Sequence, residues 1–368
     1  MRRPAFWIAV LILPLGACSP RTGGTAGTES SGRPAPELVI EDFEAEGVHG
    51  FQWLLRGAAY EQTVRVAINK DENPDIDLEG VKRALSEAMS SAYSALDDNR
   101  PESDINRLNA APPGAWIDLG TMSAAALARA RDLHELTGGA FDITIGPLFS
   151  LYRFDGQDAA SLPSPAAIQE ALRSVGPRVY DFESDRSRAR RNVAGARIVV
   201  RAIREGLVVD RGLQVARERG LTGVAISLGG EIGLVAHRTP ERFWRFPWDN
   251  QGGLKWLRMT RGAVSVSGRQ KSFFVAGGKR YSHIIDPETG MPCESGIVSA
   301  AVFASECWLA DGLATAMSVL GVGKGLQLAA SRDGVEVMLW REEASGEIAI
   351  FQSAGIRRDA DEAIWEPR

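Results

Sequence analysis

Short apolar strand segments and amphipathic helical segments are interleaved along this chain, but they do not follow the strict strand–helix–strand order that builds a parallel sheet. Strand-like patterns are clearest at 64–68, where apolar residues alternate, and in the apolar run at 224–227. Helical spacing is clearest in four segments: 78–92, 123–136, 206–218 and 307–320. The pattern predicts an α+β fold in which helices pack on largely antiparallel sheets.

Glycine, serine and proline mark where several of these elements begin or end. Ser164 followed by Pro165 predicts a helix start, because serine caps a helix and proline fits its first turn. Three glycines follow helical segments and would end them: Gly138, Gly220 and Gly321. Further predicted elements are a short strand at 198–200 and a closing hairpin of 335–340 with 347–351.

The composition is that of a globular protein and argues against a nucleic-acid binder. The 368 residues are 44% hydrophobic and 24% charged, with a net charge of −5. Nucleic-acid binders usually carry a basic surplus on one face. The one basic cluster (Arg186, Arg188, Arg190 and Arg191) directly follows the acidic stretch 181–185. We interpret it as a solvated hairpin or loop rather than a partner site.

The N-terminus has the features of a bacterial lipoprotein signal. Arg2 and Arg3 precede an apolar stretch at 5–14 that is too short to span a bilayer as a mature helix. Leu15-Gly16-Ala17-Cys18 then resembles the lipoprotein cleavage box, in which the cysteine thiol accepts the lipid. We expect a signal peptide at 1–18 with lipidated Cys18, and a protein anchored in the cell envelope facing the periplasm. An ordinary secretory signal with a chance cysteine is the alternative.

Residues 19–37 are rich in Gly, Ser, Thr and Pro and are predicted to form a flexible tether, followed by a single domain at 38–368. Cys293 and Cys307 show no CxxC spacing and no zinc pattern. In an oxidising compartment they could form a disulfide, and two unpaired buried cysteines are an equal alternative.

Asp311 and Thr315 are the first candidate functional residues. They lie four apart in a predicted helix, so their side chains share one face. Carboxylate and hydroxyl oxygens are hard ligands that suit Mg2+. The pair is also common on ordinary helices. However, this helix is otherwise rich in Ala and Leu, and a buried carboxylate needs a partner.

Two glycine-rich segments and one histidine are further candidates. The segment 137–148 and the run Gly229-Gly230-Glu231 would let the backbone approach a ligand closely, or would simply be turns. His283 precedes an Asp-Pro-Glu-Thr-Gly turn at a predicted strand end, and a lone histidine is more often structural than catalytic. The chain has no P-loop, no GxGxxG and no GxSxG motif.

Taken in order, these segments resemble the FAD:protein FMN transferase family (ApbE type), from about residue 56 to residue 340. Five segments carry the resemblance: 101–109 (PESDINRLN), 137–148 (TGGAFDITIGPL), 227–232 (SLGGEI), 281–292 (YSHIIDPETGMP) and 310–316 (ADGLATA). A lipoprotein signal is also common in this family. The resemblance implies an ApbE-like fold and Mg2+-dependent transfer of FMN from FAD to a Thr or Ser of an acceptor redox protein, with release of AMP.

The resemblance also implies a magnesium site. Asp311 and Thr315 would ligate the ion, with the backbone of Ala314 close by. Ala202 falls where the family contributes a backbone carbonyl to the same ion.

The expected flavin site is formed by other segments. Ala140, Phe141 and Asp142 would contact FAD, and Glu205 falls where the family places a residue against the flavin nucleotide. Ile284 would line the site of the isoalloxazine or the ribityl chain. His283 would be the base that takes the proton from the acceptor hydroxyl.

The sequence departs from the family pattern at several points. The family usually reads Asp-Leu-Gly-Gly where this chain reads Val199-Val200-Arg201-Ala202, so an Asp that helps to hold FAD is absent. Arg201 and Arg204 are unusual there and would be able to pair with a pyrophosphate. Arg56-Gly57-Ala58 replaces Met-Gly-Thr, and an aromatic residue is replaced near Asn99. Three alternatives therefore remain: a metal-dependent FAD pyrophosphatase, an inactive FAD-binding lipoprotein, and a lipoprotein that binds an unrelated ligand.

Overall fold

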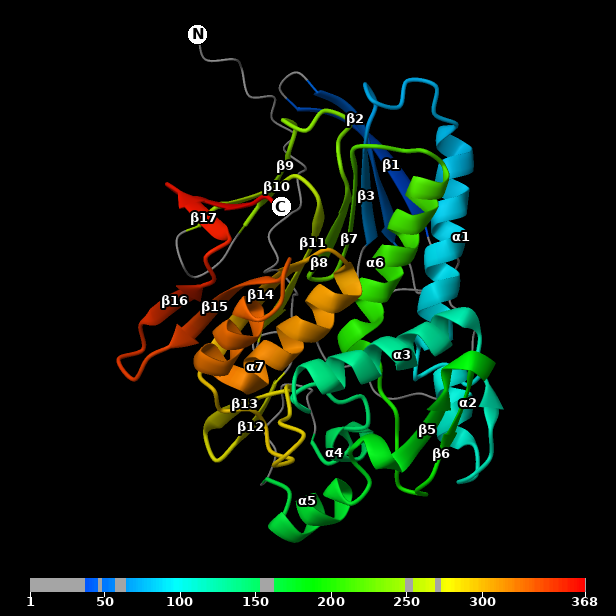
Figure 1. Ribbon diagram of the computed structural model, residues 1–368, viewed down its shortest axis with the longest axis vertical. Coiled ribbons are helices and arrows are strands. Elements are labelled where there is room, and N and C mark those ends of the chain that lie inside the picture. The colour runs from blue at the N-terminus through cyan, green and yellow to red at the C-terminus, as the bar shows by residue number, and fades with distance from the viewer. Residues whose placement is uncertain are drawn as a thin grey trace.

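The computed structural model describes residues 37–45, 48–56, 64–152, 162–248, 254–268 and 273–367 (Figure 1). The predicted signal peptide with Cys18, and all but the last residue of the predicted tether, lie outside these residues. Their assignments therefore stay predictions. Of the departure at 56–58, only Arg56 is described, at the end of a strand.

A nine-stranded antiparallel sheet forms the centre of the protein, in the order β1-β2-β3-β7-β8-β11-β14-β15-β16. Its strands are β1 (Glu37–Ala45), β2 (Val48–Arg56), β3 (Val64–Asn69), β7 (Val224–Leu228), β8 (Glu231–Val235), β11 (Gly262–Gly268), β14 (Ile297–Ala304), β15 (Glu336–Glu342) and β16 (Ile348–Gln352). The predicted antiparallel sheet and closing hairpin are confirmed.

Four of the described helices gather on one side of this sheet: α1 (Leu78–Leu96), α3 (Thr121–Leu136), α6 (Arg201–Glu218) and α7 (Cys307–Ala330) (Figure 1). Alternation along the strands separates the two faces of the sheet. Val64, Val66 and Ile68 pack with α1 and α6, whereas Ala67 packs on the opposite side. There a small sheet rich in tryptophan covers the face: β9 (Trp244–Pro247), β10 (Trp256–Met259), β17 (Ile356–Asp359) and β18 (Glu362–Trp365).

Shorter elements surround the lower ends of the helices in Figure 1. They are α2 (Asp104–Ala110), β4 (Ile117–Asp118), α4 (Gly146–Phe149), α5 (Pro165–Leu172), the 3-10 turns at Pro177–Val179 and Ser184–Arg186, β5 (Tyr180–Glu183), β6 (Arg188–Arg191), β12 (Phe273–Ala276) and β13 (Lys279–Ser282). The basic cluster lies on the β5–β6 hairpin, as expected. Arg191 is the exception, because its buried guanidinium donates to the carbonyls of Leu108 and Ala196.

The prediction of a strand at 198–200 is wrong, and the helix that follows begins earlier than expected. The side chain of Asn109 both donates to the carbonyl of Ile198 and accepts from its N–H, each at 2.8 Å, which replaces a strand partner. Helix α6 then starts at Arg201 rather than Gly206. Glycine is needed at position 206 of this helix, because the Cβ of any other residue would lie 2.6 Å from the carbonyl oxygen of Cys307, which is too close. The glycine thus allows α6 and α7 to approach closely.

Helix α7 is the described segment that is long and apolar enough to cross a membrane by composition, but it packs against α6 and the central sheet. The predicted stop at Gly321 is present as a break with φ of 71°, after which the chain continues in helical form to Ala330. Cys307 is buried at the start of α7 and Cys293 donates its thiol to the carbonyl of Ser318, so both are free thiols and the disulfide alternative is wrong.

Candidate functional site

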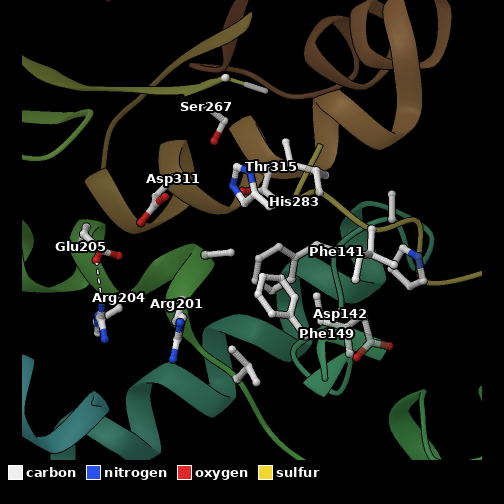
Figure 2. Close-up of a pocket in the computed structure, with 18 of the residues that line it drawn as sticks. Phe141, Asp142, Phe149, Arg201, Arg204, Glu205, Ser267, His283, Asp311 and Thr315 are labelled. Atoms are coloured by element: carbon white, nitrogen blue, oxygen red, sulfur yellow. Dashed lines mark hydrogen bonds and ion pairs between the residues drawn. The ribbon is translucent and has the colours of Figure 1, made fainter. Parts of the chain in front are cut away.

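A cavity of about 360 Å3 lies where α6, α7 and the loops after α3 and β13 meet (Figure 2). Nine of the expected site residues line it: Ala140, Phe141, Asp142, Ala202, Glu205, His283, Ile284, Asp311 and Thr315. Ala314 is fully buried behind this lining. Residues that are up to 175 positions apart in the sequence, from Ala140 to Thr315, are therefore brought to one cavity by the fold.

Asp311 is held against the first turns of α6. Its side chain is 5% exposed, and its Oδ2 accepts the N–H of Gly206 at 2.9 Å. In an α-helix that N–H is the usual donor to the carbonyl four residues earlier, which here is Ala202. The carboxylate of Asp311 is therefore placed beside the carbonyl of Ala202, and both residues line the cavity.

The donor set fits a magnesium ion. Thr315 lies one turn after Asp311 on α7, and Figure 2 shows both side chains on the same helix at the cavity. A carboxylate, a hydroxyl and a backbone carbonyl are the oxygen ligands that Mg2+ accepts alongside water and substrate phosphates. Within the described residues no group of three or more His, Cys, Asp or Glu gathers as a metal site. A magnesium ion here would therefore draw on Asp311, Thr315 and Ala202.

Asp210 fixes the start of the helix that carries Asp311 and Thr315. The N-cap residue of α7, Glu306, makes no side-chain cap bond. Instead Asp210 on α6 accepts the first two N–H groups of the helix, those of Cys307 and Trp308, each at 2.9 Å. These N–H groups lack partners within their own helix, so Asp210 stabilises α7 from a neighbouring helix.

We expect Asp210 to make a contribution to the stability of the protein that falls as the pH rises from about 4 to about 6. Burial raises the pKa of Asp210 from 3.8 to about 6, although the N–H groups of Trp308 and Cys307 oppose the shift. The folded state therefore keeps this proton over a range where the unfolded chain has released it, and it binds more protons there. The cost by pH 7 is on the order of 3 kcal/mol. Because the lowered pKa values of Glu72 and Asp181 act in the opposite direction, urea unfolding at several pH values should show this contribution as a difference between the wild type and a variant that cannot ionise at position 210.

The control for this effect is Asp210→Asn, which cannot ionise and keeps an oxygen acceptor for one of the two N–H groups, because Oδ1 and Oδ2 of Asp210 each accept one of them. Between pH 4 and pH 6 the free energy of unfolding of the wild type should fall relative to that of Asp210→Asn. An identical pH dependence in both proteins would show that Asp210 makes no such contribution.

The loop after α3 forms the apolar wall of the cavity. The hydroxyl of Thr137 accepts the N–H of Phe141 at 3.0 Å, which closes the turn through the two glycines. Asp142 accepts the N–H of Thr144 at 2.7 Å, and its other carboxylate oxygen lies 3.4 Å from Nδ1 of His134. The Asp142 carboxylate raises the pKa of His134, so the pair is stronger when the histidine is protonated. These contacts fix the loop that presents Phe141 and Asp142.

His283 directly follows β13, at a strand end as predicted, and lines the same cavity. The turn after it is closed by two backbone bonds, Gly290 N–H to the Asp286 carbonyl and Cys293 N–H to the Ile284 carbonyl, each at 2.8 Å. The Asp-Pro-Glu-Thr-Gly segment therefore acts as the turn that returns the chain and leaves His283 and Ile284 at the cavity.

Other lining residues are Phe149, Val266, Ser267 and Gly268, which no sequence pattern indicated, and Glu231, which belongs to the candidate run Gly229-Gly230-Glu231. Glu231 is buried and accepts the hydroxyl of Ser265 at 3.1 Å and the N–H of Gly230 at 2.9 Å. The sequence feature that indicated Glu231 is its position directly after two glycines that follow a buried strand. Phe149 could not be predicted because nothing in the sequence indicates that α4 brings it to the same cavity as Phe141.

The two arginines of α6 that depart from the family pattern lie in different environments, one buried and one exposed. Arg204 is 3% exposed, lies over the ring of Tyr93 at 4.2 Å, and donates to Glu205 at 2.9 Å (Figure 2). Arg201 is 41% exposed and donates to Asp98 and Asn99. Asn99, near which the sequence departs from the family pattern, thus accepts a hydrogen bond from Arg201. Val199, at the position of the missing Asp, also lines the cavity.

Comparison with known proteins identifies one family. The sequence profile of the ApbE family matches residues 57–339. A Treponema pallidum protein named FAD:protein FMN transferase is 31% identical over 266 residues, which cover 66% of this chain and 72% of that protein. The flavinyl transferase ApbE of Pseudomonas stutzeri, solved in its apo form, superposes with a TM-score of 0.72 at 25% identity, covering 86% of this chain and 96% of that one. The flavin transferase ApbE of Vibrio cholerae shares the fold, with a TM-score of 0.70 at 22% identity over 87% and 98% of the two chains.

Proposed function

The chain belongs to the ApbE family, and from that membership we propose that it is an FAD:protein FMN transferase. The observation that carries the proposal is the meeting of Asp311, Thr315 and His283 in one cavity with the loop at 140–142. We further propose that transfer depends on Mg2+, that the acceptor is a Thr or Ser hydroxyl of a redox protein, and that AMP is released.

In the proposed reaction the acceptor oxygen forms a bond to the phosphorus on the FMN side of FAD, and the bond from that phosphorus to the AMP oxygen breaks. A hydroxyl is a poor nucleophile at neutral pH, so His283 takes its proton as the bond forms, an effect worth about 10²- to 10⁴-fold. Phe141 and Ile284 offer apolar surface to the flavin, and the fixed loop at 137–144 keeps its wall in place.

Asp311, Thr315 and the carbonyl of Ala202 would hold the magnesium ion. When bound, Mg2+ supplies positive charge that stabilises the phosphate oxygens during transfer. The protein's own contribution is to fix these oxygens, through the Gly206–Asp311 bond and the Asp210 cap on α7.

Incubation with FAD and Mg2+, with and without an acceptor protein, tests this function against FAD pyrophosphatase activity. A transferase should release AMP in step with FMN attached to the acceptor. Equal AMP release without acceptor, together with free FMN, would contradict the proposal in favour of hydrolysis. Failure to bind any flavin would favour a protein for an unrelated ligand.

We propose that the protein is anchored at the periplasmic side of the cell envelope through Cys18. The support is the order of a basic stretch, a short apolar stretch and a small residue before the cysteine. Cys18→Ala should move the protein from the membrane fraction to the soluble fraction, or leave it as an uncleaved precursor, while mass spectrometry of the wild type finds a lipid on Cys18. A mature wild-type N-terminus without lipid would contradict the anchor.

A further inference from the structure

Arg201 occupies an unusual position at the cavity. It is the first residue of α6, it lines the cavity beside Val199 and Ala202, and its side chain is 41% exposed. The helix end itself has no side-chain cap, because its N-cap residue is Val200. A positive side chain and the positive end of a helix dipole therefore meet at one wall of the cavity.

Two hydrogen bonds to neighbouring side chains fix the orientation of the Arg201 guanidinium. Its Nε donates to Oδ1 of Asp98 at 2.9 Å, and its Nη2 donates to Oδ1 of Asn99 at 3.1 Å. Asp98 has a side chain only 2% exposed, so this anchor lies inside the protein. A guanidinium has five N–H donors. Within the described part of the chain these two bonds use two of the five, which leaves three for a ligand.

The neighbouring arginine cannot serve in the same way. Arg204 is 3% exposed, is ion-paired with Glu205, and lies over the ring of Tyr93. Both arginines are ion-paired, Arg201 with Asp98 and Arg204 with Glu205, but burial of the Arg204 side chain leaves a ligand little access to it. Of the two arginines on this wall, Arg201 combines an exposed guanidinium with a fixed orientation.

The proposed ligand carries the complementary charge. The diphosphate of FAD is doubly negative, and a fixed guanidinium binds phosphate oxygens with paired, charge-assisted hydrogen bonds. The cavity is also lined by four carboxylates, Asp142, Glu205, Glu231 and Asp311, which would repel a diphosphate without cations nearby. We propose that Arg201, oriented by Asp98 and Asn99, binds the diphosphate of the flavin nucleotide and selects for diphosphate-containing ligands. This inference rests on the proposed function.

The test compares Arg201→Gln with Arg197→Gln in the full-length protein in detergent. Arg197 is a matched control, because its Nη2 lies 3.8 Å from Asp98 and its side chain is 46% exposed, but it does not line the cavity. Binding of FAD is measured by flavin fluorescence and binding of ADP by calorimetry, both with Mg2+ and without acceptor. Arg201→Gln should weaken both ligands by about tenfold to a hundredfold. Arg197→Gln should stay within about twofold of the wild type.

If Arg201→Gln does not fold, Arg201→Lys provides a second test. It keeps the charge but loses the forked donors, so it should bind FAD and ADP more weakly than the wild type. Wild-type affinity in the Arg201 variants, or an equal loss in Arg197→Gln, would overturn the role of Arg201 alone. A wild-type protein that binds no FAD would overturn the proposed function as well.

Discussion

Asp311→Asn is expected to lower the rate of FMN transfer by at least about a thousandfold and to remove its dependence on Mg2+ concentration. The amide keeps an oxygen that can accept the N–H of Gly206, so the contact between α6 and α7 survives. What it loses is the negative charge that would hold the ion beside Thr315 and Ala202. Metal stabilisation of phosphate charge is worth several kcal/mol, which corresponds to a rate change of this size. The measurement is the transfer rate across a Mg2+ titration.

Ser318→Ala is the matched control for this variant. Ser318 is also a buried polar residue of α7, but it does not line the site cavity, and its hydroxyl lies 3.5 Å from the carbonyl of Ala314. Its variant should keep the wild-type Mg2+ titration. A wild-type Mg2+ response in Asp311→Asn would reject Asp311 as the metal ligand, whatever the control does.

His283→Ala is expected to lower the transfer rate by about 10²- to 10⁴-fold while FAD binding stays within a few-fold of the wild type. The physical reason is that the acceptor hydroxyl loses the group that takes its proton, whereas the Mg2+ and diphosphate contacts are untouched. The rate is measured at saturating FAD and acceptor, and FAD binding is measured separately by fluorescence.

A pH series separates loss of a base from loss of packing at His283. If His283 is the base, the wild-type rate should fall at acid pH as the imidazole becomes protonated, and the rate of His283→Ala should not follow that profile. Full transfer by His283→Ala, or an unchanged pH profile in the variant, would contradict the assignment.

The sequence predicted the elements whose patterns are local. The amphipathic helices 78–92 and 123–136, the buried strand at 224–227 and the closing hairpin are all present, because their apolar spacing is set by contacts along one element. The prediction of a strand at 198–200 was wrong because the contact that decides the structure there is not local. The backbone groups of Ile198 are taken by the side chain of Asn109, which is 89 positions away and invisible to a local pattern.

The expected site residues meet in one cavity, but the contacts that fix them could not be read from the sequence. Asp311 and Thr315 were indicated by their helical spacing. The bond from Gly206 to Asp311 and the cap that Asp210 places on α7 join two helices about a hundred positions apart. The same holds for Arg201, whose partner Asp98 lies just after the end of α1. The residue types in the sequence indicated which side chains could bind a metal or a phosphate. The residues that hold those side chains in place became known only from the fold.

Intact-protein mass spectrometry of an acceptor redox domain, after incubation with FAD, Mg2+ and the full-length protein, tests the proposed transfer of FMN. We expect one FMN added to a Thr or Ser of the acceptor, AMP released in equal amount, and loss of both when Mg2+ is chelated. Tight FAD binding with neither FMN adduct nor AMP would contradict the proposed transfer, and would make this chain a flavin-binding protein that does not transfer FMN.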